Sequence, residues 1–245
     1  MRVLIIGGVA AGTKVAAKLK RENRGAEVLI LTKSQDISYA GCGLPYYVGD
    51  VIQERSQLIV NTPQSFAKLT GAQVKTGAEV IALDRQEKQV TAVDLQTGEE
   101  CRYSYDKLVI ATGASPIAPS IPGADLKNVF YMRTPQDAED LKAAVQSGTI
   151  KRAVIAGGGF IGLEVAENLS SQGIRTTVID MAPHIMPGFD PEMAEYVENY
   201  LADNGIMAMT NTRLEGVEGT DAVEKVKTSR RAMKADALIM CLGIR

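Results

Sequence analysis

The sequence predicts an α/β protein with two Rossmann-like βαβ domains, each built on a parallel sheet and accompanied by small antiparallel meanders. The first observation is an internal repeat. RVLIIGGVAAG (2–12) and RAVIAGGGFIG (152–162) both run from an apolar strand through a glycine-rich turn into a helix. The second observation is that the units end alike. DKLVIATG (106–113) and DALIMCLG (236–243) share an aspartate, an apolar strand and a final glycine at the same offsets.

Each glycine turn is followed by a helix and a second strand, which completes a βαβ unit twice. The apolar residues at helical spacing after the two turns are Val15, Ala16, Leu19, Leu163, Ala166 and Leu169. Gly173 suits the position just past the end of the second helix. EVLILT (27–32) and TTVID (176–180) are then the second strands.

Shorter segments give the domain boundaries. QVKTG (73–77), EVIALD (79–84) and QVTAVDL (89–95) alternate in polarity and predict antiparallel strands of a meander. ASPIAPSIPG (114–123) holds three prolines in seven residues and predicts a connector. We therefore expect a first domain over 1–112, a connector over 113–123 and a second domain over 124–245.

Composition excludes several classes of function. The net charge is −2 and the Lys and Arg residues form no long runs, so we expect no nucleic-acid partner. Met1 and Arg2 lead directly into a strand, and no apolar run approaches the roughly 18 residues of a membrane span. The three cysteines and the single histidine, His184, have no metal-ligand spacing. We expect a cytoplasmic protein with free thiols and no metal.

The second glycine turn predicts a pyridine nucleotide site. GGGFIG (157–162) is a full GxGxxG, in which Gly157 makes the tight turn, Gly159 lets a pyrophosphate approach and Gly162 lets helix and strand pack closely. Asp180 follows at the end of the second strand. Its carboxylate can accept hydrogen bonds from a ribose 2′-hydroxyl and would repel a 2′-phosphate, which favours NADH over NADPH.

The first glycine turn is less regular. In GGVAAG (7–12) Val9 replaces the middle glycine, and Thr32 stands where a ribose-binding acid is expected. The residues alone leave two interpretations open: a nucleotide site, or a degenerate domain that binds no nucleotide.

The whole chain resembles the flavin-dependent pyridine nucleotide–disulfide oxidoreductases. The resemblance is carried by GGVAAG, YDKLVIATGASP (105–116), IPG (121–123), MRTPQDA (132–138), GGGFIGLE (157–164) and ADALIMCLGIR (235–245). It implies that the first unit binds FAD and the second binds NAD(P)H. The residues that it places at the two cofactors are Gly7, Gly8, Val9, Ala10, Ala11, Gly12, Thr32, Lys33, Ser38, Val80, Ala111, Thr112, Gly113, Arg133, Gly157, Gly159, Phe160, Ile161, Gly162, Glu164, Asp180 and Gly243.

Within that family, SYAGCGLPYYVGD (38–50) resembles the single-cysteine branch of coenzyme A disulfide reductases and NADH-dependent persulfide reductases. Tyr47 occupies the position of the second cysteine of the two-cysteine branch, so the resemblance makes Cys42 the redox residue. Gly41 departs from the Asn often found in coenzyme A relatives, and Thr32 departs from the usual Glu. The NADH oxidases and peroxidases also use one cysteine, as a sulfenic acid, but the peroxidases carry a histidine where this chain has Ala10.

Local chemistry favours a reactive Cys42. LPYYVGD (44–50) predicts the start of a helix with Pro45 in its first turn, and a helix N-terminus favours an anion such as a thiolate. Cys101 is expected to be incidental and Cys241 to lie in the core. Lys20 and Arg21 form either a solvated face or, as in the coenzyme A relatives, a contact to substrate phosphates.

The resemblance therefore implies a flavoprotein that passes hydride from NADH to FAD, and then electrons to a disulfide or persulfide through Cys42. It implies Phe160 as an aromatic gate over the flavin and Glu164 as a neighbour of the nicotinamide. Family members continue beyond the position of Arg245, so we expect a longer parent, a homodimer, that completes the FAD domain. Two alternatives stay open: an NADH oxidase or peroxidase, and a nucleotide-binding fragment without catalysis.

Overall fold

The computed structural model describes all residues from Met1 to Arg245 and confirms an α/β fold with two parallel sheets and two antiparallel ones. The chain divides into two compact units. Unit 1 comprises Met1–Ala40 and Ile59–Gly113, and unit 2 comprises Gly41–Leu58 and Ala114–Arg245. None of the helices combines the length and the apolar composition that a membrane-spanning segment requires.

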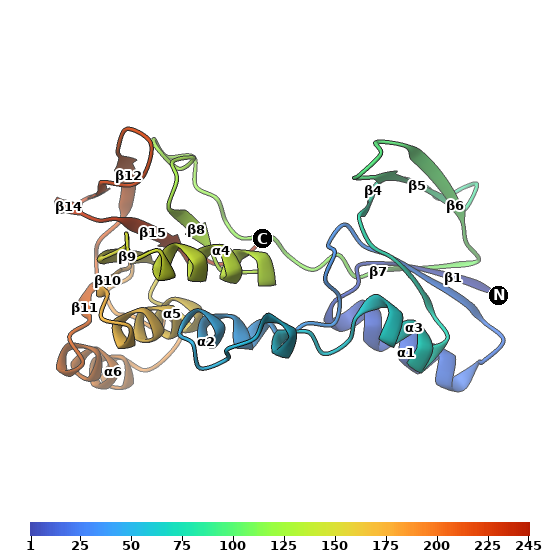
Figure 1. The fold of residues 1–245 in the computed structure, drawn as a ribbon, viewed down its shortest axis with the longest axis horizontal. Helices are drawn as coiled ribbons and strands as arrows, with labels where there is room; N and C mark the ends of the chain where they lie inside the picture. Colours follow the sequence, from blue (N-terminus) through green and yellow to red (C-terminus); the bar gives the residue numbers. More distant parts are fainter. The chain divides into compact units, whose positions relative to one another are not determined.

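Unit 1 places two helices on one face of its parallel sheet and a meander on the other (Figure 1). The parallel sheet has the strand order β3-β2-β1-β7, and the meander has the order β4-β5-β6. Its elements are β1 (Arg2–Ile6), α1 (Ala10–Glu22), β2 (Glu27–Leu31), α3 (Pro63–Thr70), β3 (Gln73–Lys75), β4 (Ala78–Asp84), β5 (Gln89–Asp94), β6 (Glu100–Ser104) and β7 (Lys107–Ile110).

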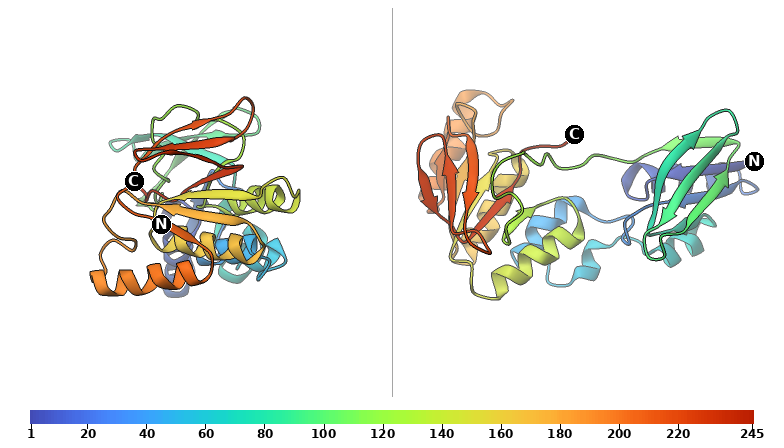
Figure 2. Two further views of the ribbon diagram at one scale, coloured as in Figure 1. Left: turned by 90° about the vertical axis from the view of Figure 1, so that its left-hand side faces the viewer. Right: turned by 90° about the horizontal axis from the view of Figure 1, so that it is seen from above.

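Unit 2 repeats this plan with one additional strand in its parallel sheet and two additional helices. Its parallel sheet has the order β11-β10-β9-β15-β8, and its meander, which is best followed from above in Figure 2, has the order β12-β13-β14. The sheet strands are β8 (Val129–Tyr131), β9 (Arg152–Ala156), β10 (Arg175–Ile179), β11 (Met207–Met209) and β15 (Ala237–Met240). The other elements are α4 (Pro135–Gln146), α5 (Phe160–Ser171), α6 (Pro191–Asp203), β12 (Leu214–Glu218), β13 (Lys225–Thr228) and β14 (Ala232–Lys234).

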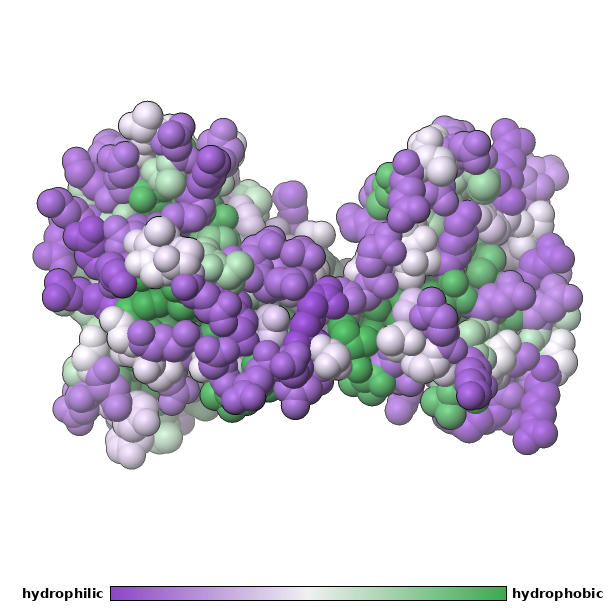
Figure 3. Space-filling model, viewed as in Figure 1, coloured by the Kyte–Doolittle hydropathy of each residue, from purple (hydrophilic) through white to green (hydrophobic).

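Apolar side chains of the strands fill both interiors. Val3 and Ile5 of β1 and Val154 of β9 are buried, as the apolar runs predict. The repeat extends to the register, because Arg2 lies opposite Glu27 in unit 1 and Arg152 lies opposite Arg175 in unit 2. On the face drawn in Figure 3, hydrophilic residues cover most of the surface of each unit.

Helix boundaries follow from local signals. α4 begins at Pro135 behind a capping box, in which the Thr134 side chain accepts from the Asp137 amide and Asp137 accepts from the Thr134 amide. α5 ends at Ser171, and Gly173 follows with a φ of 79°, as predicted. In α1, Ala16 is buried, whereas Val15 is exposed and does not belong to the apolar face.

The predicted meander of unit 1 was partly wrong. β4 and β5 pair antiparallel as expected, but Gln73–Lys75 forms β3, which pairs parallel with β2 at the edge of the main sheet. The third meander strand is β6, which contains Cys101. Because β6 is half exposed, its sequence is largely polar and lacks the apolar alternation from which a strand is predicted.

The segment Gly41–Leu58 belongs to a different unit from the one expected. The sequence analysis placed it in the first domain, whereas its contacts group it with unit 2. It contains the 3₁₀ turns η1 (Gly41–Gly43) and η2 (Arg55–Leu58), with α2 (Leu44–Val48) between them. α2 packs against α4 and α5 (Figure 1). The connector residues Ser115 and Ile117 in turn pair with the last residues of the chain, 243–245.

Candidate functional site

The glycine turn between β9 and α5 is shaped by close backbone packing. Gly157 has a φ of 112°, and a Cβ there would collide with the carbonyl oxygen of Cys241. A Cβ at Gly162 would collide with the carbonyl oxygen of Gly157. A Cβ at Gly159, by contrast, would meet nothing within 4 Å. The turn is therefore tightly packed on the sheet side and open at Gly159, where α5 begins and where a pyrophosphate would approach.

Asp180 is held at this turn by its own hydrogen bonds. Its Oδ2 accepts from the Gly158 amide at 2.7 Å, and its Oδ1 accepts from the Ala182 amide at 2.8 Å. Gly157, Gly159, Asp180 and Gly243 together line a cavity of about 570 Å³. A fixed carboxylate beside an open helix N-terminus fits the ribose and pyrophosphate of a pyridine nucleotide.

The other predicted nucleotide residues of unit 2 lie at the start of α5 and near α4. Phe160 is 62% exposed and its ring meets the ring of Phe189 edge-on, with centroids 5.6 Å apart. Ile161 is also exposed, and Glu164 lies one turn further along α5. Arg133 lies before α4, where its Nε donates to the Ala114 carbonyl at 3.2 Å.

The glycine turn between β1 and α1 gathers predicted FAD residues of unit 1. Gly7 has a φ of 107°, and a Cβ there would collide with the Ala111 carbonyl, which precedes Thr112 and Gly113. Val9 caps α1 without a side-chain hydrogen bond, and Ala10, Ala11 and Gly12 form the first turn. No acidic residue lies in that turn. Its amides and the helix dipole therefore fit a phosphate group.

Thr32 and Ser38 complete the unit 1 turn. Thr32 is buried, with its Cγ2 3.1 Å from where a Cβ of Gly8 would lie. The Ser38 amide donates to the Gly8 carbonyl at 3.1 Å, and Ser38 has a φ of 48°. The structure thus brings Gly7, Gly8, Thr32, Ser38 and Ala111 together around one turn.

Four other predicted residues of unit 1 do not join that turn. Val80 packs into the core beneath the meander, and Lys33 pairs with Glu79 at 3.6 Å. Lys20 lies at the far end of α1, where its Nζ donates to the Arg24 and Ala26 carbonyls at 2.9 and 3.0 Å. Arg21 is exposed beside it. Lys20 therefore fastens the loop that follows α1.

Cys42 lies in η1, directly before α2, and is exposed. Behind it, Leu44, Pro45, Tyr47 and Val48 are buried, so α2 is fixed while the cysteine stays accessible. Cys241 differs. Although that residue is only half-buried as a whole, burial of its thiol raises its pKa to about 12, which makes it inert. No group of three or more His, Cys, Asp or Glu side chains is placed to hold a metal ion.

Tyr46 lies close enough to both Cys42 and Glu164 for their charges to act on it. The pKa of Tyr46 is raised above its usual value, chiefly by the negative charge of Glu164, with further contributions from burial, Glu167 and Cys42. The phenol therefore keeps its proton, which it shares in a hydrogen bond with the Glu164 carboxylate.

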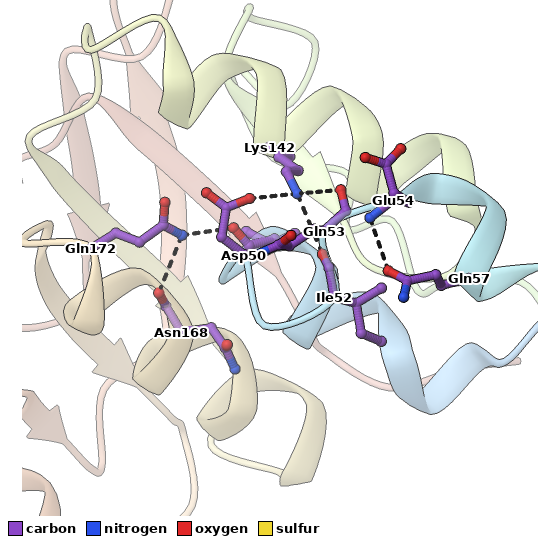
Figure 4. Close-up of polar contacts among 9 residues, drawn as sticks. Asp50, Ile52, Gln53, Glu54, Gln57, Lys142, Asn168 and Gln172 are labelled. Carbon is purple, nitrogen blue, oxygen red and sulfur yellow. Dashed lines mark hydrogen bonds and ion pairs between the residues drawn. The ribbon is translucent and has the colours of Figure 1, made fainter.

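Long-range contacts within unit 2 anchor the cysteine segment (Figure 4). The Lys142 side chain is 8% exposed, and its Nζ lies 2.6 Å from Asp50 Oδ1 and 3.4 Å from the carbonyls of Ile52 and Gln53. The same Nζ lies 4.0 Å from the centroid of the Tyr47 ring. Lys142 thus holds both ends of the turn after α2.

Contacts with α5 form the second anchor. Gln172 Nε2 donates to the Val48 carbonyl at 2.6 Å, and a Cβ at Gly49 would collide with the Asn168 side chain. Sequence reasoning missed these residues. The available signal was Lys142 and Asn168 at helical positions whose spacing otherwise predicts buried apolar residues.

Comparisons with known proteins identify relatives over the whole chain. The family described as pyridine nucleotide-disulphide oxidoreductase matches residues 1–245. An NADH oxidase of Methanocaldococcus jannaschii is 35% identical over 246 residues, covering 100% of this chain and 55% of the relative. An NAD(P)H sulfur oxidoreductase (CoA-dependent) of Pyrococcus abyssi is 37% identical over 244 residues, covering 99% of this chain and 53% of the relative.

A solved NAD-dependent persulfide reductase from A. fulgidus has the same fold, with a TM-score of 0.96 and 35% identity. The match covers 100% of this chain and 46% of the solved reductase. The chain thus spans about half the length of the curated relatives it matches. These matches confirm the predicted resemblance to the family, and the relatives include enzymes named for sulfur reduction. Members of this family use FAD and a pyridine nucleotide as cofactors, as predicted.

Proposed function

We propose, since the chain belongs to the pyridine nucleotide-disulphide oxidoreductase family, that it supplies the nucleotide sites and the reactive cysteine of an NADH-dependent reductase of disulfides or persulfides. The observation that carries the proposal is the exposed Cys42 in the turn directly before α2, a helix that is largely buried and anchored. The proposal also takes the whole protein to be a cytoplasmic homodimer.

The two glycine turns bind and orient the nucleotides. In unit 2 the open backbone at Gly159 receives the pyrophosphate, and Asp180 accepts from the ribose hydroxyls of NADH. In unit 1 the first turn of α1 receives the phosphates of FAD. When bound, FAD supplies the two-electron chemistry that links the nicotinamide to the sulfur centre.

Cys42 performs the sulfur exchange. Its thiolate attacks one sulfur of a disulfide RS–SR, so that a Cys42–SR bond forms, the S–S bond breaks and RS⁻ leaves. Two electrons and one proton then return the mixed disulfide to the Cys42 thiolate and a second thiol. In this cycle the protonated Tyr46 hydroxyl turns from its hydrogen bond with Glu164 to donate to the sulfur anions that develop in both halves.

The second candidate function is an NADH oxidase, in which Cys42 cycles through a sulfenic acid. The M. jannaschii relative, named as an NADH oxidase, favours it. Ala10 offers no proton-transferring side chain in the first glycine turn, which favours the sulfur substrate.

The test compares the FAD-loaded protein with its Cys42→Ser variant under anaerobic conditions. NADH should bleach the flavin in both proteins. Coenzyme A disulfide or a persulfide should restore the colour only when Cys42 is present, with a loss of at least 10³-fold in the variant. Cys101→Ser is the matched control and should retain full activity.

Three results would contradict the proposal. Sulfur reduction that survives Cys42→Ser would remove the role of Cys42. Reoxidation by oxygen but not by a sulfur substrate would favour the oxidase. A protein that binds NADH but remains colourless after FAD is added would support a nucleotide-binding fragment.

A further inference from the structure

Unit 2 contains a second cavity, at the edge of its sheet opposite the glycine turn. This cavity measures about 390 Å³ and lies between the starting residues of β9, β10 and β11 and the meander strand β14. Nucleotides bind Rossmann-like sheets at the carboxyl ends of the strands, whereas this cavity lies at the amino ends. It is therefore separate from the NADH site.

Four cations and no carboxylate line this cavity. The cations are Arg152, Arg175, Arg231 and Lys234. Between them, Val154, Met207 and Met233 form an apolar floor. A concave apolar surface with a few convergent charges is the usual form of a small-molecule site.

Most of this charge is not neutralised by the protein. Arg152 pairs with Asp236 at 2.8 Å, but Arg175 and Lys234 form no ion pair. Arg231 Nη2 contacts only sulfur atoms, those of Met207 and Met209, at 3.8 Å.

Unit 1 has a cavity at the equivalent place, and the two cavities differ in the charge of one lining residue. The unit 1 cavity lies between β1, β2, β3 and β6 and is also lined by cations, but it includes Glu27. Glu27 lies opposite Arg2 in the sheet and pairs with it at 3.3 Å. In unit 2 the same register position holds Arg175 opposite Arg152. Arg175 thus replaces the glutamate, and because Arg152 is already paired with Asp236, the charge of Arg175 remains for an external anion to neutralise.

We propose that the cavity beneath the unit 2 meander binds an organic phosphate with an apolar body. Guanidinium groups bind phosphate through paired N–H donors, and a dianion suits three uncompensated cations better than a carboxylate does. The methionine floor accommodates the apolar part, because methionine adapts to irregular shapes. Neither the flavin nor the nicotinamide site takes part.

The experiment titrates the protein with 1-naphthyl phosphate in the presence of saturating NADH, by calorimetry. Saturable binding is expected, and Arg175→Glu, which restores the unit 1 charge, should weaken it at least tenfold. Arg230→Glu is the matched control, since Arg230 is next to Arg231 in sequence but does not line the cavity. It should change the dissociation constant less than twofold.

Further arms separate the parts of the ligand. Inorganic phosphate and 1-naphthol should each bind at least tenfold more weakly than the ester, and 1-naphthoate should bind more weakly as well. Tighter binding of the naphthoate would overturn the assignment to phosphate. Equal losses in Arg175→Glu and Arg230→Glu, binding that occurs only when NADH is left out, or absence of saturation would overturn the site. If Arg175→Glu does not fold, Arg175→Gln and Lys234→Gln replace it, each with an expected loss of about threefold.

Discussion

The glycine turn after β1 and the glycine turn after β9 can be compared position by position. The Gly7 and Gly157 amides both donate at 2.8 Å to the last carbonyl of the neighbouring strand, Leu31 in unit 1 and Ile179 in unit 2. The next glycine carbonyl accepts from Ser38 in one unit and from Met186 in the other.

The side chains differ at two positions. Asp180 of unit 2 is replaced by Thr32 in unit 1, and the open Gly159 is replaced by Val9. The shared backbone therefore serves packing between strand and helix, which both units need. We expect the two variable positions to determine which nucleotide each unit binds, because they differ where the shared packing does not constrain the side chain.

The sharpest test of the shared backbone is an alanine at the first glycine of either turn. Gly157→Ala places a Cβ against the Cys241 carbonyl, and Gly7→Ala places one against the Ala111 carbonyl, both at a φ that disfavours side chains. Each should destabilise its unit by about 3 kcal/mol, measured by urea unfolding. Gly159→Ala is the control and should leave stability within about 0.5 kcal/mol. Equal losses at Gly157 and Gly159 would refute the packing argument.

Sequence predicted the turns because their signals are local. An apolar strand, a glycine turn and the start of a helix lie within eleven residues of the sequence. Asp180 directly follows the strand that comes next, β10. The attachment of Cys42 to unit 2 could not be predicted, because it depends on Lys142 and Gln172, about 90 and 120 residues distant. Only the fold brings those helices to α2.

The exchange of Asp180 for Thr32 gives the next test of the comparison. Asp180→Thr should weaken NADH binding about tenfold or more, because the ribose loses a charged acceptor fixed by the Gly158 amide. NADPH should lose much less, since the repulsion of its 2′-phosphate is removed as well. Equilibrium titrations of both nucleotides, followed by nicotinamide fluorescence, measure the ratio. Thr32→Asp in unit 1 is the control and should leave NADH binding unchanged. An unaltered ratio in Asp180→Thr would remove Asp180 from the specificity of unit 2.

The smallest expected effect concerns the aspartates that directly precede β7 and β15, Asp106 and Asp236. The pKa of Asp236 is below its usual range, because hydrogen bonds from Arg152 and from the Lys151 and Arg152 amides outweigh burial, which acts to raise it. The pKa of Asp106 is also lowered, chiefly by the Arg2 amide at 2.6 Å. Because the pKa is lower in the folded state, each carboxylate stabilises the fold at pH values above the unfolded-state pKa of about 3.9. This contribution is lost as the pH falls toward the folded-state pKa.

Asp236→Asn should therefore cost about 1 kcal/mol at pH 7, a modest value because the Arg152 side chain is 41% exposed. It should also flatten the loss of stability as the pH falls through the unfolded pKa of about 3.9 toward the lower folded one. Asp106→Asn should act in the same direction but less strongly. Asp106 accepts from one backbone amide, whereas Asp236 accepts from two backbone amides and pairs with Arg152. Urea unfolding at a series of pH values measures both slopes. A larger effect at Asp106 than at Asp236 would show that the backbone amide, common to both units, provides the stabilisation, and that the Arg152 ion pair adds nothing to it.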